Sequence, residues 1–343
     1  MKTYRVTLTL RAPAASAWQA DTIFGHLCWL LTWRYGEAAF KQWLELYQQQ
    51  TPPLLLSDGF PGELLPRPVP PPPPDKEEHK AEGMKNADAR KKLKGIEWLT
   101  LAEFETIRQG QPFAASAEGD KIREQLGLPR VTFKNQISRL TGTTGEEGNL
   151  YPFVEEVFWK PLEQSETLTF QNKITIYLRI ADQDFPVADS DGKTKILSME
   201  TLVRQLFDDL VATGYGKRKS VGYGEIEQCE WLSFNCGFAP IADANAFVSL
   251  SHFVPAKDDP REGQWRVNVK YGKLGGEFAL PNPFKHPLIM LMPGSWFATL
   301  TPDKAWYGRL VPDIVHDRPD IVQYGYAFAL PMKIAVSKGE CDV

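Results

Sequence analysis

The densest set of chemically active residues in the sequence is residues 214–224, which read Gly-Tyr-Gly-Lys-Arg-Lys-Ser-Val-Gly-Tyr-Gly. The glycines carry no side-chain bulk, so the backbone amides can approach a bound group closely. Three consecutive cations at 217–219 supply donors that suit phosphate oxygens. Tyr215 and Tyr223 add ring faces on which bases could stack. We call this segment the glycine-rich loop, and its candidate nucleic-acid contacts are Gly214, Gly216, Lys217, Arg218, Lys219, Ser220, Gly222, Tyr223 and Gly224.

The spacing in the loop does not fit the two best-known phosphate-binding motifs. The dinucleotide-binding fingerprint needs a third glycine where Lys219 stands. That motif and the mononucleotide phosphate loop both follow a strand and open a helix, whereas the glycine-rich loop follows a helical pattern and opens a strand pattern. Residues 192–194 (GKT) also fail, because the mononucleotide loop needs a glycine where Val187 sits. The remaining alternative is a solvated turn whose lysines only keep it soluble.

Four further residues are candidate contacts outside the loop. Lys134 and Arg139 precede a threonine- and glycine-rich tip at 141–148, where they could meet a nucleic-acid strand. Ser16 and Trp18 lie between the first predicted strand and the first predicted helix, where they could bond to or stack on a nucleotide. The alternatives are ordinary surface cations on a strand for the first pair and core packing for Trp18.

His26 is the one candidate for catalysis, because a histidine could act as a general base in RNA cleavage. It lies on the same side of a predicted helix as Trp29 and Trp33, and a histidine packed between tryptophans is more often structural. No serine or cysteine nucleophile stands in a recognisable motif, and the five histidines are scattered. We therefore expect no catalytic residue, no metal site and no cofactor.

The composition indicates a globular protein in which any binding of a polyanion depends on a local basic patch. The chain has 343 residues, 43% of them hydrophobic, which suffices for two ordinary cores. Its formal net charge is −4, so nucleic-acid binding requires a local basic patch. No apolar run approaches the ~20 residues that span a bilayer, and the four cysteines form no Cys-x-x-Cys pair. Because the N-terminus also lacks the features of a signal peptide, we expect a cytoplasmic protein without disulfides.

The order of predicted elements favours an α+β fold, with an elaborated ferredoxin-like unit followed by a β-rich domain. We expect two ferredoxin-like modules with insertions, the second rich in β-strands. The first domain is expected at 1–233, with an insertion at about 66–95 that contains a proline run and a charged stretch. The second is expected at 234–343. The main predicted elements are strands at 4–12, 54–56, 130–133, 150–158, 168–180 and 225–231, helices from 21, 100 and 198, and later strands at 246–253, 265–271, 276–280, 288–292, 296–300 and 321–330.

The glycine-rich loop, between a helix and a strand, resembles that of the RAMP superfamily of CRISPR proteins. Further segments are similar to the fourth subunit of the type III-A, or Csm, effector complex, and the resemblance covers nearly the whole chain. Those segments are 21–29 (DTIFGHLCW), 56–60 (LSDGF), 91–96 (KKLKGI), 135–142 (NQISRLTG), 248–255 (VSLSHFVP), 282–288 (NPFKHPL), 293–297 (PGSWF) and 323–328 (QYGYAF).

The resemblance implies a non-catalytic, RNA-binding subunit of an antiviral ribonucleoprotein. Such a subunit caps the 5′ handle of the CRISPR RNA and joins the large polymerase-like subunit to the adjacent backbone RAMP subunit. In that family, target-RNA cutting, DNA cutting and cyclic-oligonucleotide synthesis belong to other subunits. The alternative is a RAMP endoribonuclease that processes precursor CRISPR RNA with His26 as base.

Overall fold

The computed structural model describes residues 1–70, 95–127, 129–135, 137, 139–144, 150–157, 172–188, 191–233, 238–275, 283–302, 304–316, 318 and 320–334. Most of the predicted insertion, residues 71–94, lies outside the described residues. So do part of the predicted tip at 141–148 and the predicted strand at 276–280. All structural statements below concern the described part of the chain.

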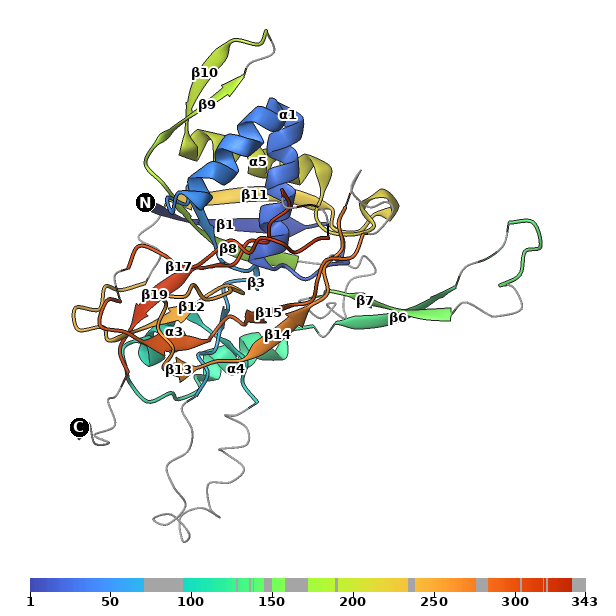
Figure 1. The fold of residues 1–343 in the computed structure, drawn as a ribbon. Helices are drawn as coiled ribbons and strands as arrows, with labels where there is room; N and C mark the ends of the chain where they lie inside the picture. The colour runs from blue at the N-terminus through green and yellow to red at the C-terminus, as the bar shows by residue number, and fades with distance from the viewer. Residues whose placement is uncertain are drawn as a thin grey trace.

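A five-stranded antiparallel sheet forms the centre of the N-terminal half (Figure 1). In β1, every second side chain is buried, as the period of two in a strand requires when one face packs on helices. The long strands β1, β8 and β11 match predicted ones. The strand order is β11 (Ile226–Ser233), β1 (Lys2–Leu10), β8 (Asn172–Ile180) and β2 (Leu54–Leu56), and β3 (Phe60–Pro61) pairs with the other end of β8.

Two helices, α1 (Ala20–Gln48) and α5 (Met199–Thr213), cover one face of this sheet (Figure 1). Gly36 kinks α1 because its backbone angles (φ 82°, ψ 172°) are not helical. Ser198 caps α5 as predicted, and its side chain accepts a backbone amide of the first turn. The helix ends at Gly214, whose φ of 73° only glycine adopts readily. The glycine-rich loop therefore starts at the end of a rigid helix.

A two-stranded antiparallel ribbon, β6 (Arg130–Asn135) with β7 (Leu150–Glu155), extends away from the body of the protein (Figure 1). We call this ribbon the arm. It confirms the predicted strand pair around the tip. Its root is the end at which Arg130 pairs with Glu155. One face of the arm carries exposed apolar side chains, namely Val131, Phe133, Leu150 and Val154.

The C-terminal half consists of small sheets, as its β-rich sequence predicts. A four-stranded sheet has the order β13 (Gly263–Gln264), β16 (Trp296–Ala298), β12 (Ala246–Ser249) and β19 (Ala329–Met332). Beside it lie two ribbons, β14 (Val267–Lys270) with β15 (Leu288–Leu291), and β17 (Tyr307–Gly308) with β18 (Tyr326–Ala327).

The remaining elements join these units. Helix α3 (Leu101–Arg108) starts with the predicted capping box, in which Thr100 and Glu103 bond to each other's backbone amides. The proline run begins at Pro66, in the short strand β4 (Leu65–Pro66). Within that run, the carbonyl of Val69 accepts the indole N–H of Trp296 from the C-terminal sheet. Elements that the sequence did not predict include α4 (Ala117–Glu124) and the hairpin β9 (Asp184–Ala188) with β10 (Thr194–Ser198). They also include the short strand β4, which pairs with β5 (Trp98–Leu99).

The largest hydrophobic core runs through both halves of the chain. It contains Leu8 of β1 and Leu206 of α5 together with Phe328 and Leu330 of the C-terminal half. The mixed helical and antiparallel architecture confirms the α+β prediction. The domain boundary after residue 233 and both ferredoxin-like modules stay predictions. No described helix combines the length and apolar character needed to cross a membrane.

Candidate nucleic-acid interface

The glycine-rich loop is closed at its neck by its own backbone. The amide of Tyr215 donates to the carbonyl of Gly224 over 2.9 Å, which brings the two ends of the loop together. Gly224 has a φ of 66°, and a Cβ atom at this position would stand 1.8 Å from the carbonyl oxygen of Tyr215. Only glycine fits this neck, so the residue type is required by the close approach of two backbone segments.

Three bonds anchor the loop to α1 and to the connection between β1 and α1. Gly216 donates its amide to Nε2 of His26 over 3.0 Å, and Lys217 donates its amide to the Ser16 hydroxyl over 3.1 Å. Gly224 donates its amide to the carbonyl of Pro13. The lower part of the loop is thereby fixed to the protein, and residues 217–222 form its outer turn.

The outer turn offers donors without internal acceptors. Arg218 has a left-handed backbone (φ 61°) and leads into a single 3₁₀ turn, Lys219–Val221. Among the described residues, no acceptor bonds the backbone amides of Arg218, Lys219 or Ser220. Consecutive free amides around a left-handed residue form a concave anion-binding site. None of the three cations forms an ion pair with a described carboxylate, so the turn is strongly positive.

Burial corrects the predictions for two aromatic residues. Trp18 is only 3% exposed, and its ring stacks on that of Tyr215 with centroids 3.7 Å apart. Tyr215 is fully buried and donates its hydroxyl to the carbonyl of Ala17. Neither ring is open to a base, so both support the neck of the loop. Ser16 also has a structural role, because its hydroxyl accepts the Lys217 amide.

The root of the arm is joined to the far side of the loop through Glu155. This carboxylate is 3% exposed and accepts a hydrogen bond from the Tyr223 hydroxyl and another from Arg130. Lys134 donates to the same hydroxyl and lies 4.6 Å from the ring centroid of Tyr223. Hydrogen bonds from Tyr223 and Arg130 hold the pKa of Glu155 below its usual value against the opposing effect of burial. Tyr223 and Lys134 thus belong to a bonded cluster at one edge of the loop.

Arg218 lies against the aromatic side chains of the arm. Its guanidinium donates to the Tyr151 hydroxyl over 2.9 Å and stands 4.5 Å from the ring centroid of Phe153. The cation is therefore oriented by the arm while its charge stays exposed to solvent. Arg139 is exposed and follows the far end of β6, so the structure does not bring it to the loop.

His26 supports the loop in the structure. Its Nε2 accepts the Gly216 amide, so the lone pair that a general base needs is already engaged. Burial, with a smaller contribution from the Lys219 ammonium, lowers the pKa of His26 from 6.5 to about 4. The imidazole is neutral near pH 7 and acts as a hydrogen-bond acceptor for the backbone.

Comparison with known proteins identifies the fold. No protein-family model matches the sequence, and no curated protein matches it. A chain of the Csm1-Csm4 cassette in complex with cA4 is 16% identical, over 98% of this chain and 100% of that one, with a TM-score of 0.54. A chain of the Csm3-Csm4 subcomplex in the type III-A CRISPR-Cas interference complex is 14% identical, over 97% and 100%, with a TM-score of 0.57. Csm4 is the component common to both assemblies.

The chain shares its fold with the matched chains of these two Csm4-containing assemblies. The fold that the sequence resemblance implied is confirmed. Identities of 14–16% establish the fold alone, so the function has to be argued from the residues of this chain.

Within this fold, several segments that carry the resemblance converge at the start of α1. Asp58 accepts hydrogen bonds from the amides of Ala20 and His252, and its second oxygen lies 2.5 Å from Nδ1 of His252. Lys270 and Gln323 both donate to the buried carboxylate of Asp21. These contacts join residues up to 302 positions apart. The polar residues of the motifs therefore form one structural junction under the loop.

Sequence reasoning missed the residues that support the interface. Tyr151, Phe153 and Glu155 lie on one face of β7, and only their alternation in the sequence indicated that they share a face. The bond between His26 and Gly216 joins residues 190 positions apart, which no local pattern reveals. Among the described residues, no three histidine, cysteine or acidic side chains are grouped to hold a metal ion.

Proposed function

We propose that this chain is an RNA-binding subunit of a type III-A CRISPR effector ribonucleoprotein, and that the outer turn of its glycine-rich loop holds the 5′ handle of the CRISPR RNA. One observation carries the proposal. Within the described part of the chain, the turn combines three cations without carboxylate partners and three consecutive backbone amides without acceptors, on a loop whose neck is closed by a backbone hydrogen bond. Such a site is suited to the phosphates of a nucleic-acid strand.

The surroundings favour a single RNA strand over a duplex. Arg218 is held on the rings of the arm, and Lys134 lies over the rings of Phe153 and Tyr223. A loop that approaches the sugar-phosphate chain beside fixed cations and aromatic residues is typical of single-strand recognition. In this proposal Lys217, Arg218, Lys219 and Ser220 bind phosphate, and the glycines of the loop permit its close approach.

Two different protein neighbours are part of the proposal. The matched chains come from one assembly that contains Csm1 and from another that contains Csm3. By analogy, this chain bridges the large polymerase-like subunit and the adjacent backbone RAMP subunit. The exposed apolar face of the arm supports a protein-binding role, because such faces are commonly covered in assemblies.

We further propose that the subunit has no catalytic centre of its own. His26, which the endoribonuclease alternative requires as a base, accepts a backbone amide and is buried beneath the loop. No observation favours the enzyme over the binding subunit. Incubation of the purified protein with labelled repeat RNA tests this part, and metal-independent cutting that His26→Gln abolishes would contradict it.

The RNA-binding role is tested by replacing Lys217, Arg218 and Lys219 together by alanine. Binding of a labelled handle RNA is measured over a series of salt concentrations. Each lost phosphate contact on a single strand reduces the slope of log affinity against log salt by about 0.7, so the triple variant should lose about 2 from that slope. Its affinity at low salt should fall by at least about tenfold.

The matched control removes three cations elsewhere. Lys41, Lys195 and Lys257 are exposed and lie in separate parts of the chain, so their replacement by alanine changes the net charge equally. This control should keep nearly the whole salt slope. An unchanged slope in the loop variant, or an equal loss in both variants, would contradict the proposed role of the loop.

A further inference from the structure

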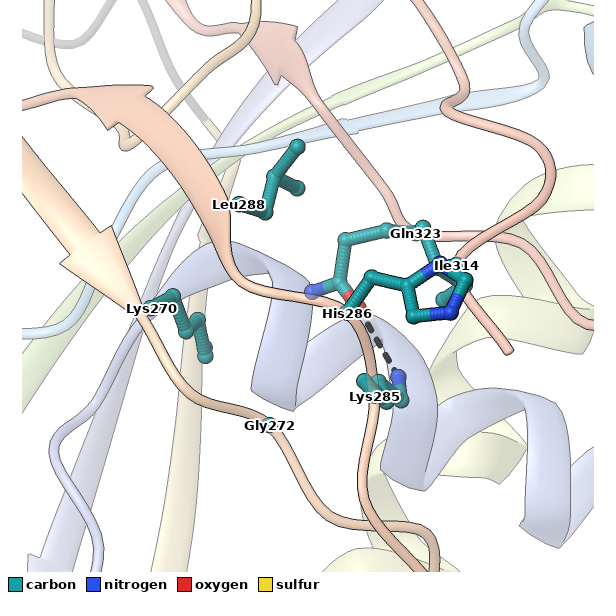
Figure 2. A pocket seen from close by; sticks show the side chains of 7 residues that line it. All are labelled: Lys270, Gly272, Lys285, His286, Leu288, Ile314 and Gln323. Carbon is teal, nitrogen blue, oxygen red and sulfur yellow. Dashed lines mark hydrogen bonds between the residues drawn. The ribbon is translucent and has the colours of Figure 1, made fainter. Parts of the chain in front are cut away.

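A small pocket that contains two lysines lies beside the first turn of α1, at the edge of the polar junction described above. Lys285 reaches across it to the Gln323 side chain (Figure 2). The enclosed volume is about 10 Å³, roughly the space of one water molecule, so the pocket admits a single oxygen-sized group and excludes a whole nucleotide. The lining residues are Lys270, Gly272, Lys285, His286, Leu288, Ile314 and Gln323.

The charges around the pocket do not balance. Asp21 is the one carboxylate among the residues that bond within it, and Lys270 contacts that carboxylate directly. Lys285 donates over 2.8 Å to the amide oxygen of Gln323, and it forms no ion pair with a described carboxylate. Two ammonium groups therefore face one carboxylate, and one positive charge is in excess. Burial lowers the pKa of Lys285, which indicates that the unpaired charge is unfavourable in the empty pocket.

The Lys285 side chain is held in place from both ends. Its backbone amide donates to the carbonyl of Gly272, and a Cβ atom on Gly272 would stand 2.9 Å from Cδ of Lys285, so the glycine leaves room for the lysine stem. Next to it, His286 donates from Nδ1 to the carbonyl of Asp313, which fixes the ring at the mouth of the pocket. The pocket is thus already shaped in the free protein.

The pocket lies close to the glycine-rich loop along the same helix. Lys270 donates to the Thr22 hydroxyl over 3.0 Å, and His26 accepts the Gly216 amide from the loop. Residues four apart on a helix share a face and are separated by about 6 Å along its axis. The start of α1 therefore connects the cations of the loop with those of the pocket.

We propose that Lys285 binds a single phosphate group of the same RNA strand, as a second anchoring point next to the glycine-rich loop. This inference rests on the proposed RNA-binding function. A phosphate supplies the missing negative charge and accepts hydrogen bonds from the lysine, and the mouth of the pocket exposes it to a passing strand. An acidic side chain of a partner protein carries the same charge, but the position beside the loop favours RNA.

The test combines one protein variant with a neutral phosphate analogue. Lys285→Met removes the charge and keeps an apolar stem, and Lys273→Met removes an equal charge from an exposed residue nearby, outside the pocket. The handle RNA is prepared as a set in which each backbone phosphate in turn is a methylphosphonate. The affinity of the intact protein should fall roughly tenfold when the methylphosphonate is at the one linkage that the pocket binds, which is about the contribution of one charged hydrogen bond.

The expected result is a specific loss of additivity. Lys285→Met should bind unmodified RNA roughly tenfold more weakly, and neutralising that same linkage should weaken it no further. Lys273→Met should respond like the intact protein at every linkage. Identical methylphosphonate profiles for Lys285→Met and the intact protein would overturn the inference. The profile of the intact protein alone stays informative if the variant folds poorly.

Two further arms separate the sources of the charge and the two proposals. In the first arm, inorganic phosphate replaces chloride in the buffer at equal ionic strength, and the affinity for unmodified RNA should not fall as it does when that linkage is neutralised. Binding of free phosphate in the pocket, with no loss of affinity at any methylphosphonate linkage, would overturn the RNA assignment. The RNA assignment would also be overturned if Lys285→Met lost a protein that co-purifies with the intact chain while its affinity for RNA stayed the same. If the loop variant loses RNA and Lys285→Met does not, only the pocket fails, whereas RNA binding unaffected by both variants contradicts the proposed function as well.

Discussion

At the scale of single residues, the neck of the glycine-rich loop depends on Gly224. A methyl group there would stand 1.8 Å from the carbonyl oxygen of Tyr215, so Gly224→Ala must open the neck. Gly222 provides the matched control, because it also has a positive φ but nothing within 4 Å of an added Cβ. We expect Gly222→Ala to cost about 1–2 kcal/mol and Gly224→Ala at least about 3 kcal/mol in urea unfolding. Equal losses would contradict the role assigned to the neck.

His26 gives the same loop a dependence on pH. Its imidazole is neutral in the folded protein down to about pH 4, whereas an unfolded chain binds the proton near pH 6.5. Between these values the unfolded state holds more protons, so the free energy of unfolding falls as the pH drops from 6.5 towards 4, by up to about 3 kcal/mol. His26→Gln lacks this titration, and its stability should fall less over the window. If the free energy of unfolding changed with pH by the same amount in both proteins, this account would be contradicted.

At the scale of elements, the arm is joined to the body by a small charged cluster. Glu155 is buried, accepts a hydrogen bond from Tyr223 and pairs with Arg130 and Lys134, so Glu155→Gln leaves these two cations without their carboxylate. A two-stranded ribbon is marginal by itself, and it depends on such contacts at its root. We expect at least about tenfold faster amide hydrogen exchange in both strands of the arm, with a small change in the global unfolding temperature.

The control for this prediction is Glu227→Gln, which removes a carboxylate from an exposed surface pair with Arg11. It should leave exchange in the arm unchanged, because exposed ion pairs contribute little. Equal exchange in the intact protein and Glu155→Gln would mean that the cluster does not hold the arm.

The elements themselves were largely predictable, and their contacts were not. The apolar stripe and Ser198 cap of α5, the capping box at Thr100 and the alternation of β1 are local signals, so the sequence indicated these elements. The same local signal describes Tyr215 and Tyr223, yet one ring is buried on Trp18 and the other lies at the arm. Which tyrosine faces inward depends on a residue 197 positions away, and no local pattern carries that information.

At the scale of the whole molecule, the two halves meet in a polar junction as well as in a shared core. Asp58 contacts both Ala20 at the start of α1 and His252 after β12. The short strand before Asp58 was predicted, but the pairing with His252 spans 194 residues. The cationic pocket at Lys285 arises from the same junction, because Gln323 bonds to Lys285 and also to Asp21. The positions that shape the proposed RNA-binding face and those that join the halves are therefore coupled.

This coupling predicts that the described halves unfold together. Asp58→Ala leaves two buried amides and the His252 ring without their acceptor, which should lower the free energy of unfolding by about 3 kcal/mol. Urea unfolding is followed by tryptophan fluorescence and by far-ultraviolet circular dichroism, and both should shift by the same amount in one transition. Asp182→Ala, which removes an exposed partner of Lys2, should change the free energy of unfolding by less than about 0.5 kcal/mol. Two separate transitions, with only one displaced by Asp58→Ala, would show that the halves are independent and that the shared core does not couple them.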